Sequence, residues 1–165
     1  DLAGAIQPVA TLAGARLDET KGVSGAAVSA DGTRLFLTTQ EREILAFDMA
    51  TAEPAWFAPG MGEVVVLGDM VVTAAAEGRR PHGLQVLAAA DGRRLCGFGD
   101  KKIRGVDKIS PRARLTGHTT SDGHHLFVLV PNGVRVFKLA HHTVETVEPV
   151  RIPVEERPED DDAAE

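Results

Sequence analysis

The sequence predicts an all-β protein built from three diverged copies of a four-stranded antiparallel unit. A tight-hairpin signal recurs, because residues 30–37 read Ala-Asp-Gly-Thr-Arg-Leu-Phe-Leu and residues 121–128 read Ser-Asp-Gly-His-His-Leu-Phe-Val. Each is an Asp-Gly turn followed by a polar pair and an apolar strand. A weaker copy occupies residues 67–72. The apolar runs between these turns are short and show no helical periodicity, which favours strands throughout.

A second landmark follows each hairpin signal, so that the strands group into units spaced by about 40 residues. The first unit has strands at 25–29, 35–39, 43–48 and 54–58, the second at 63–67, 70–76, 84–87 and 94–98, and the third at 114–119, 125–130, 134–139 and 143–147. An additional strand is predicted at 6–13. The predicted organisation is therefore an N-terminal strand and linker (1–24), units at 25–60 and 61–99, a basic loop (100–113), a third unit (114–150) and a disordered acidic tail (151–165).

The composition suits one globular domain with a core of small aliphatic side chains. Apolar residues make up 43% of the 165, there is no Tyr, and six Phe accompany one Trp, so the core depends on Val, Leu, Ile and Ala. No apolar run approaches the roughly 20 residues that a membrane-spanning helix needs, and no membrane partner is expected. The chain opens on Asp1, from which we expect a processed form or one part of a longer polypeptide.

The charge is concentrated at the C-terminus. Seven acids and one base stand in residues 155–165, and the rest of the chain carries equal numbers of acidic and basic residues. The net charge of −6 therefore belongs to the tail, which has the composition of a disordered, solvated segment. The single Cys96 excludes an internal disulfide and favours a reducing compartment, the cytoplasm or nucleus, over secretion.

The first unit resembles blades of the WD40, YVTN and quinoprotein-like β-propeller superfamilies. The resemblance is carried by residues 29–36, Ser-Ala-Asp-Gly-Thr-Arg-Leu-Phe, and by residues 44–56, in which a strand ends on Asp48, a turn of small residues follows, and Trp56 stands on the next strand. No unit ends in Trp-Asp, and Cys96 and Thr146 stand where the first unit has Trp56. The subfamily is therefore undecided, and the resemblance implies architecture and not activity.

If the units are blades, the fold is a partial β-propeller of about three four-stranded antiparallel blades that this chain does not close. Propellers typically have four to eight blades, and an unclosed set leaves sheet edges open. The expected sources of the missing blades are, in order, the rest of a longer chain, a partner chain and self-association.

The basic loop is the candidate partner-binding site. Six bases occur within residues 100–114, against two acids, and they are Lys101, Lys102, Arg104, Lys108, Arg112 and Arg114. Such a loop suits phosphate groups or an acidic protein surface. No aromatic residue interleaves these bases, which weakens an interpretation as a single-stranded nucleic-acid site. The alternative is an ordinary solvated loop.

Histidine offers the one candidate for metal chemistry, because five of the six stand in the third unit: His118, His124, His125, His141 and His142. Neighbouring histidines on a strand point to opposite faces, however, and a metal needs further ligands with matched directions. We therefore expect no metal site. No Gly-x-Ser-x-Gly, glycine-rich phosphate loop or His-Glu-x-x-His motif is present, so we expect neither a cofactor nor a catalytic residue.

The sequence thus predicts a non-catalytic β-propeller scaffold that contributes blades and a basic loop to protein–protein interactions in a multi-subunit assembly. The expected partners are proteins, including whatever supplies the remaining blades, with RNA or an acidic surface at the basic loop. Two alternatives stay open. One is part of a quinoprotein-like propeller enzyme whose active centre lies in blades outside this chain, and the other is an RNA-facing propeller subunit of a ribonucleoprotein.

Overall fold

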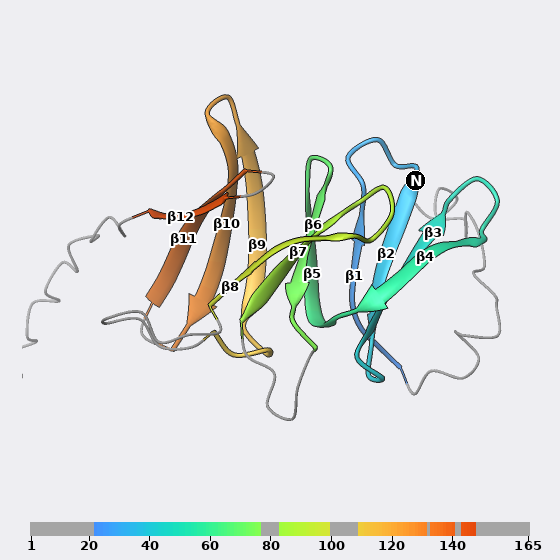
Figure 1. Cartoon of the computed structure of the whole chain (residues 1–165), viewed down its shortest axis with the longest axis horizontal. Coiled ribbons are helices and arrows are strands. Elements are labelled where there is room, and N and C mark those ends of the chain that lie inside the picture. The colour runs from blue at the N-terminus through green and yellow to red at the C-terminus, as the bar shows by residue number, and fades with distance from the viewer. Residues whose placement is uncertain (1–21, 77–82, 100–108, 132, 141–142, 148–165) are drawn as a thin grey trace, which may run out of the picture.

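The chain forms three separate four-stranded antiparallel sheets in the order of the sequence (Figure 1). The computed structural model describes residues 22–76, 83–99, 109–131, 133–140 and 143–147. The predicted strand at 6–13 and the acidic tail lie outside these residues. Within them the prediction of an all-β chain is confirmed, since every element is a strand, and they contain no helix of the length and apolarity needed to cross a membrane.

Sheet 1 consists of β1 (Val23–Val28), β2 (Arg34–Thr39), β3 (Glu43–Asp48) and β4 (Pro54–Pro59). Sheet 2 consists of β5 (Met61–Leu67), β6 (Met70–Ala74), β7 (Leu84–Ala88) and β8 (Arg94–Phe98). Sheet 3 consists of β9 (Arg114–Thr120), β10 (Gly123–Val130), β11 (Gly133–Ala140) and β12 (Thr143–Val147). Each strand pairs with the next along the chain, as expected for hairpins joined by short turns.

Turn chemistry explains why the hairpins close where the sequence predicted. Asp31 accepts hydrogen bonds from the backbone N–H of Thr33 and from the Ser29 hydroxyl, and Asp48 accepts from the N–H of Ala50. Such Asx turns fix a reversal without help from distant residues. Gly68 has φ +61° in the two-residue turn between β5 and β6, a conformation that favours glycine.

The strands nearest to one another in neighbouring sheets are the first strand of each, because β5 contacts both β1 and β9. Figure 1 shows the three sheets side by side, with the later strands of each sheet turned away from these inner strands, as the twist of a sheet requires. All three inner strands begin at the same end of the molecule, which we call the entry end. The Asp-containing turns lie at the opposite end.

Sheet 2 is covered on both faces. On one side Val71 and Leu87 pack with Phe36 and Ile44 of sheet 1. On the other side a larger apolar cluster joins sheet 2 to sheet 3, and its fully buried members include Val72 and Leu126. Both clusters follow from the period of two along a strand, which sends neighbouring side chains to opposite faces. The core is therefore two inter-sheet layers with sheet 2 between them.

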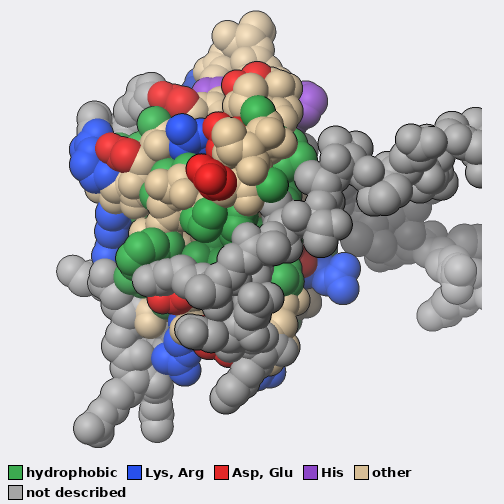
Figure 2. Space-filling model, turned by 90° about the vertical axis from the view of Figure 1, so that its right-hand side faces the viewer, with side chains coloured by type: hydrophobic (Ala, Val, Ile, Leu, Met, Phe, Trp, Pro, Cys, Tyr) green, Lys and Arg blue, Asp and Glu red, His purple; other side chains and the backbone are tan. Residues whose placement is uncertain are grey.

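The faces of sheets 1 and 3 that point away from sheet 2 carry the exposed large apolar side chains of the described residues. On sheet 1 these include Val28 and Phe57, at 50% and 57% exposure, while Leu45 and Phe47 of the same face are buried. Figure 2 views the molecule from this side and shows hydrophobic side chains gathered at its centre. On sheet 3 they are Leu129 and Val134, which are register partners. Both outer faces thus present surface of the kind that packs against another sheet.

Candidate functional site

The structure describes two of the six predicted partner-binding bases. Lys101, Lys102, Arg104 and Lys108 lie outside the described residues. Arg112 stands in the turn before β9, and Arg114 is the first residue of β9. Arg114 pairs with Leu129 on the outer face of sheet 3, whereas Arg112 lines a pocket between sheets 1 and 2 at the entry end. The two described bases therefore do not share one surface.

The pocket has a volume of about 370 Å³, near the lower end of the range of small-ligand sites. Residues at the starts of β1 and β5, at the end of β2 and just before β9 meet around it. They are Ser24, Thr39, Gln40, Met61, Gly62, Glu63, Pro111, Arg112 and Ala113. It is the place where the three sheets converge at the entry end.

Glycine at the junction between β4 and β5 allows this convergence. Gly62 has φ +73°, and a side chain on it would collide with the carbonyl oxygen of Pro111. A side chain on Gly25 would likewise collide with the carbonyl oxygen of Gly62. Close approach of one backbone to another is a role that glycine alone fills, so the two glycines set the narrow spacing of the sheets beside the pocket.

Hydroxyl groups tie sheet 1 to this junction. Thr38 is fully buried, and its Oγ1 donates to the carbonyl oxygen of Gly62. The Ser24 hydroxyl donates to Thr38 Oγ1 at 3.1 Å. A buried hydroxyl needs such a partner to offset its desolvation, and here the partner belongs to the next sheet.

Glu63 links the junction to sheet 3. Its Oε2 accepts a hydrogen bond from the backbone N–H of Leu115 at 2.5 Å, across 52 positions of sequence. The residue is half-buried, and no Lys, Arg or His of the described residues forms an ion pair with it. Its Oε1 has no hydrogen-bond partner among the same residues. The pocket therefore contains a carboxylate held in place by backbone and open on one side.

The predicted basic loop leaves from and returns to the entry end. Ile109 N donates to Gly99 O at 3.1 Å, and Gly83 N donates to Ile109 O at 3.0 Å. Ile109 is fully buried in the apolar cluster between sheets 2 and 3, and its side chain lies directly against Gly99, where a Cβ would collide with it. These contacts fix both ends of the loop beside the start of β9.

His124 and His125 point to opposite faces of sheet 3, as predicted for neighbours on a strand, whereas His118 is the register partner of His125 and shares its face. The His124 ring lies against Gly68 of sheet 2, and its Nδ1 is 2.9 Å from Thr119 Oγ1. His125 lies on the outer face, 3.8 Å from a carboxylate oxygen of Asp122, which also pairs with Lys138. His141 and His142 lie outside the described residues. Within the described part of the chain, no three His, Cys, Asp or Glu side chains form a group that would hold a metal ion.

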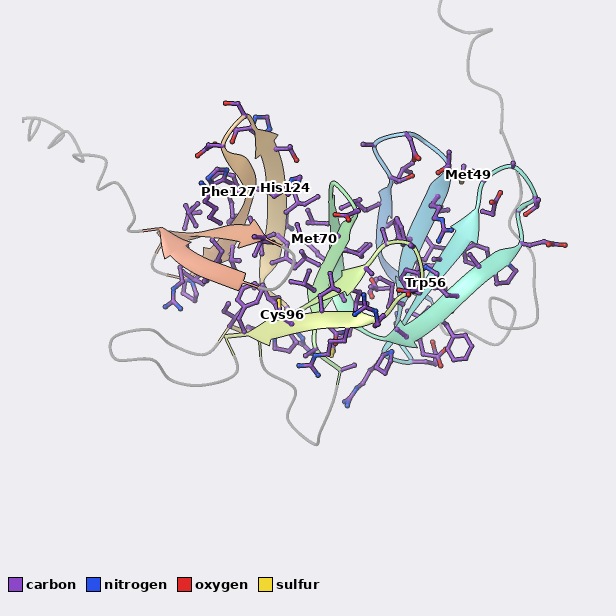
Figure 3. All side chains as sticks on the ribbon, turned by 45° about the horizontal axis from the view of Figure 1, so that its top comes forward. Met49, Trp56, Met70, Cys96, His124 and Phe127 are labelled. Carbon is purple, nitrogen blue, oxygen red and sulfur yellow. The ribbon has the colours of Figure 1, made fainter. Side chains whose placement is uncertain are left out.

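Cys96 occupies the place on β8 that Trp56 has on β4 (Figure 3). It is half-buried in the cluster between sheets 2 and 3, and burial raises the pKa of its thiol, with Arg94 acting in the opposite direction. The thiolate is the reactive form of cysteine. At neutral pH this thiol is therefore held in its unreactive, protonated form.

No protein-family model matches the chain, and no curated protein matches it. Solved structures do resemble it. U3-55K matches with a TM-score of 0.55 and 14% identity over 82% of this chain, and the WD40 domain of Toxoplasma gondii coronin with 0.55 and 14% over 76%. The three sheets are β-propeller blades. Dihydro-heme d1 dehydrogenase NirN, in complex with DHE, matches with a TM-score of 0.56 and 14% identity over 76%.

The chain spans 41% of U3-55K, 34% of the coronin domain and 28% of NirN. Identities this low show the propeller fold alone, and the same fold carries unrelated functions. The partial propeller predicted from the sequence is confirmed, and its subfamily stays undecided. The three described sheets do not close into a ring.

The sequence indicated Arg112 as a candidate but did not predict the pocket that it lines. The signals that were available are the glycines at the strand starts, Gly25, Gly60 and Gly62, because repeated glycine beside a strand indicates close approach of backbone. Nothing in the sequence singles out Glu63, whose role depends on a hydrogen bond to a residue in another sheet.

Proposed function

We propose that the chain is a non-catalytic protein-interaction scaffold, which contributes three blades to a propeller completed by blades outside it and holds a protein partner at the entry end. The observation that carries the proposal is the convergence of two features there. The pocket between sheets 1 and 2 opens at the entry end, and both anchors of the basic loop, Gly99 and Ile109, lie at the same end.

The rigid framework around the pocket supports partner binding at the entry end. The pocket walls come from strands and from turns held by backbone hydrogen bonds, and rigid frameworks that present loops are the usual carriers of binding sites.

The outer faces of sheets 1 and 3 support the proposal that further blades complete the propeller. Phe57 on sheet 1 and Leu129 on sheet 3 leave apolar surface exposed, and neighbouring blades are the elements that cover such faces in a closed propeller.

Site-specific photocrosslinking tests the binding end. We expect a crosslinker at Gln40, an exposed residue on the pocket rim, to capture a defined protein that rebinds in purified form. The same crosslinker at Ala50, in an exposed turn at the opposite end, is the matched control. Equal capture from both positions, or none from Gln40, contradicts the proposal.

The enzyme and ribonucleoprotein alternatives give different results. Capture of RNA from Gln40, with an affinity that falls steeply between low and moderate salt, indicates phosphate contacts. A chromophore that copurifies with the completed ring indicates an enzyme. Either result replaces the scaffold proposal.

A further inference from the structure

We propose that the pocket at the entry end takes a basic side chain, arginine or lysine, of the protein partner, with Glu63 as its counter-ion. This inference rests on the proposed function and specifies the partner's chemistry. It follows from a half-buried carboxylate, one oxygen of which accepts from Leu115 N, while neither oxygen forms an ion pair with a Lys, Arg or His of the described residues.

The position of Glu63 suits it to bind a cation and distinguishes it from a fully solvated surface carboxylate. The backbone of Leu115 fixes the carboxylate, so its orientation does not depend on a flexible partner. Charge-assisted hydrogen bonds to a carboxylate are stronger than neutral ones, and partial burial reduces their screening by solvent. A cation that enters the pocket therefore gains more here than at an exposed acid.

The rest of the pocket suits the stem and the remaining donors of such a side chain. Met61, Pro111 and Ala113 supply apolar wall, against which the methylenes of Arg or Lys pack while the charged group reaches a polar partner. The hydroxyl oxygen of Ser24 is a further acceptor beside this wall. Arginine has five N–H donors and benefits most from several acceptors.

Arg112 lines the same pocket and would favour an anion. The pocket therefore contains two opposite charges, each of which favours a ligand of a different charge. The Arg112 side chain is exposed, and only its backbone N–H has a hydrogen bond within the described part of the chain, to Ser110 Oγ. A long exposed side chain keeps its charge in water at little cost, whereas a half-buried carboxylate does not. Glu63 therefore sets the preference of the pocket.

The test is an NMR titration of the 165-residue chain with single blocked amino acids. N-acetyl-arginine amide and N-acetyl-lysine amide are expected to shift the amide signals of Gly62 and Leu115. N-acetyl-citrulline amide, a neutral analogue of nearly the same shape, is expected to bind about tenfold more weakly. Binding of N-acetyl-aspartate amide in preference to the basic probes would overturn the proposal.

Two pairs of variants assign the effect to charge. Glu63→Gln keeps an oxygen that accepts from Leu115 N, and it should lower the affinity for the arginine probe about tenfold, while the exposed Glu53→Gln should leave it unchanged. Gln40→Glu and Gln40→Lys change only an exposed rim residue, so folding is not at stake, and they should raise and lower the affinity respectively. Arginine binding that survives both Glu63→Gln and Gln40→Lys would refute the role of Glu63.

Arg112→Gln separates the two possible signs. The affinity of the Arg112→Gln variant for a basic ligand should stay the same or rise about twofold, since the substitution removes a like charge. A loss of binding indicates an anionic ligand and contradicts the inference.

Failure of this inference is distinguishable from failure of the proposed function. If crosslinking from Gln40 captures a partner whose affinity is unchanged by Glu63→Gln, only the present inference is wrong. If the basic probes bind but no protein is captured, the scaffold function is wrong.

Discussion

The two interfaces between sheets are held together in different ways. Between sheets 1 and 2, side-chain donors reach backbone acceptors: Trp56 Nε1 and Arg34 Nη1 both donate to Ala89 O at 3.0 Å, and Gln85 Nε2 donates to Pro59 O. Between sheets 2 and 3, the contact is mainly apolar, with the rings of Phe98 and Phe137 5.0 Å apart.

The difference arises at equivalent positions. Arg34 and Met70 begin the second strand of their sheets, and Trp56 and Cys96 stand at the same place on the fourth. Sheet 1 therefore presents polar anchors to sheet 2, whereas sheet 2 presents Met70 and Cys96 to sheet 3. Directional hydrogen bonds fix how two sheets are placed, while apolar burial supplies most of the free energy. We expect the first interface to be sensitive to hydrogen-bond loss and the second to volume.

The largest effect is expected from a cavity in the apolar interface. Leu126→Ala removes a fully buried side chain between sheets 2 and 3 and should reduce the free energy of unfolding by about 2–5 kcal/mol. Hydrogen exchange should show protection lost first in sheet 3. The exposed Leu129→Ala is the control and should cost about 0.5 kcal/mol or less. Equal loss of protection in sheets 1 and 3 would contradict separate interfaces.

The next effect concerns the turn that the anchors of sheet 1 hold. Gly92 has φ +73°, and a Cβ there would meet the six-membered ring of Trp56, so Gly92→Ala should cost about 1–3 kcal/mol. Gly32→Ala is the matched control, because Gly32 has φ +71° with open space around it. Its substitution therefore costs only the strain of a positive φ, without a collision. If urea denaturation gives equal losses for the two variants, Trp56 does not constrain this turn.

A smaller loss should follow from removing one hydrogen bond. Trp56→Phe keeps an aromatic ring against Phe36, 5.7 Å away between centroids, and removes the donor to Ala89 O, which should cost about 0.5–1.5 kcal/mol. A double-mutant cycle with Arg34→Met, measured by denaturant unfolding, gives the coupling energy between the two donors to Ala89 O. A coupling energy of zero would mean that the two donors act independently.

The smallest effect is a dependence on pH at the turns. The Ser29 hydroxyl, followed by Thr33, lowers the pKa of Asp31 from 3.8 to about 2. A lowered pKa in the folded state stabilises the protein above pH 3.8, and this contribution is lost as the pH falls towards 2. An NMR titration should give a midpoint near 2 for Asp31, and Asp31→Asn should flatten the acid limb of the stability curve. A midpoint near 3.8 would disprove the turn's effect.

Asp122 tests the same idea in sheet 3. The Thr120 hydroxyl, and after it Lys138, lowers the pKa of Asp122, so its contribution is also lost as the pH falls below its usual value. Because part of this shift comes from an exposed ion pair with Lys138, added salt should raise the Asp122 midpoint more than that of Asp31.

The strands were predictable because their signals are local. Asp-Gly turns and alternating apolar residues specify a hairpin within about ten positions, and the predicted strand 43–48 has the observed bounds of β3. The predicted strand 70–76 was too long, since β6 ends at Ala74. The repeat period then predicted the grouping into sheets.

The candidate site was predictable only in part, because it is assembled across sheets. Thr38 and Gly62 are 24 positions apart, and Glu63 and Leu115 are 52 apart. No pattern in one segment reports such a contact. The basic character of the loop was visible in the sequence, but the separation of Arg112 from Arg114 onto different surfaces depends on where β9 begins, which fixes which of its side chains face sheet 2.

The double coverage of sheet 2 has a mechanical consequence. Its strands β6 and β7 are buried on both faces, whereas sheets 1 and 3 each have one face turned away from it. In a stacked array each sheet is stabilised by its immediate neighbours. A molecule stretched from its two ends should therefore lose an outer sheet first and sheet 2 in the last step of extension.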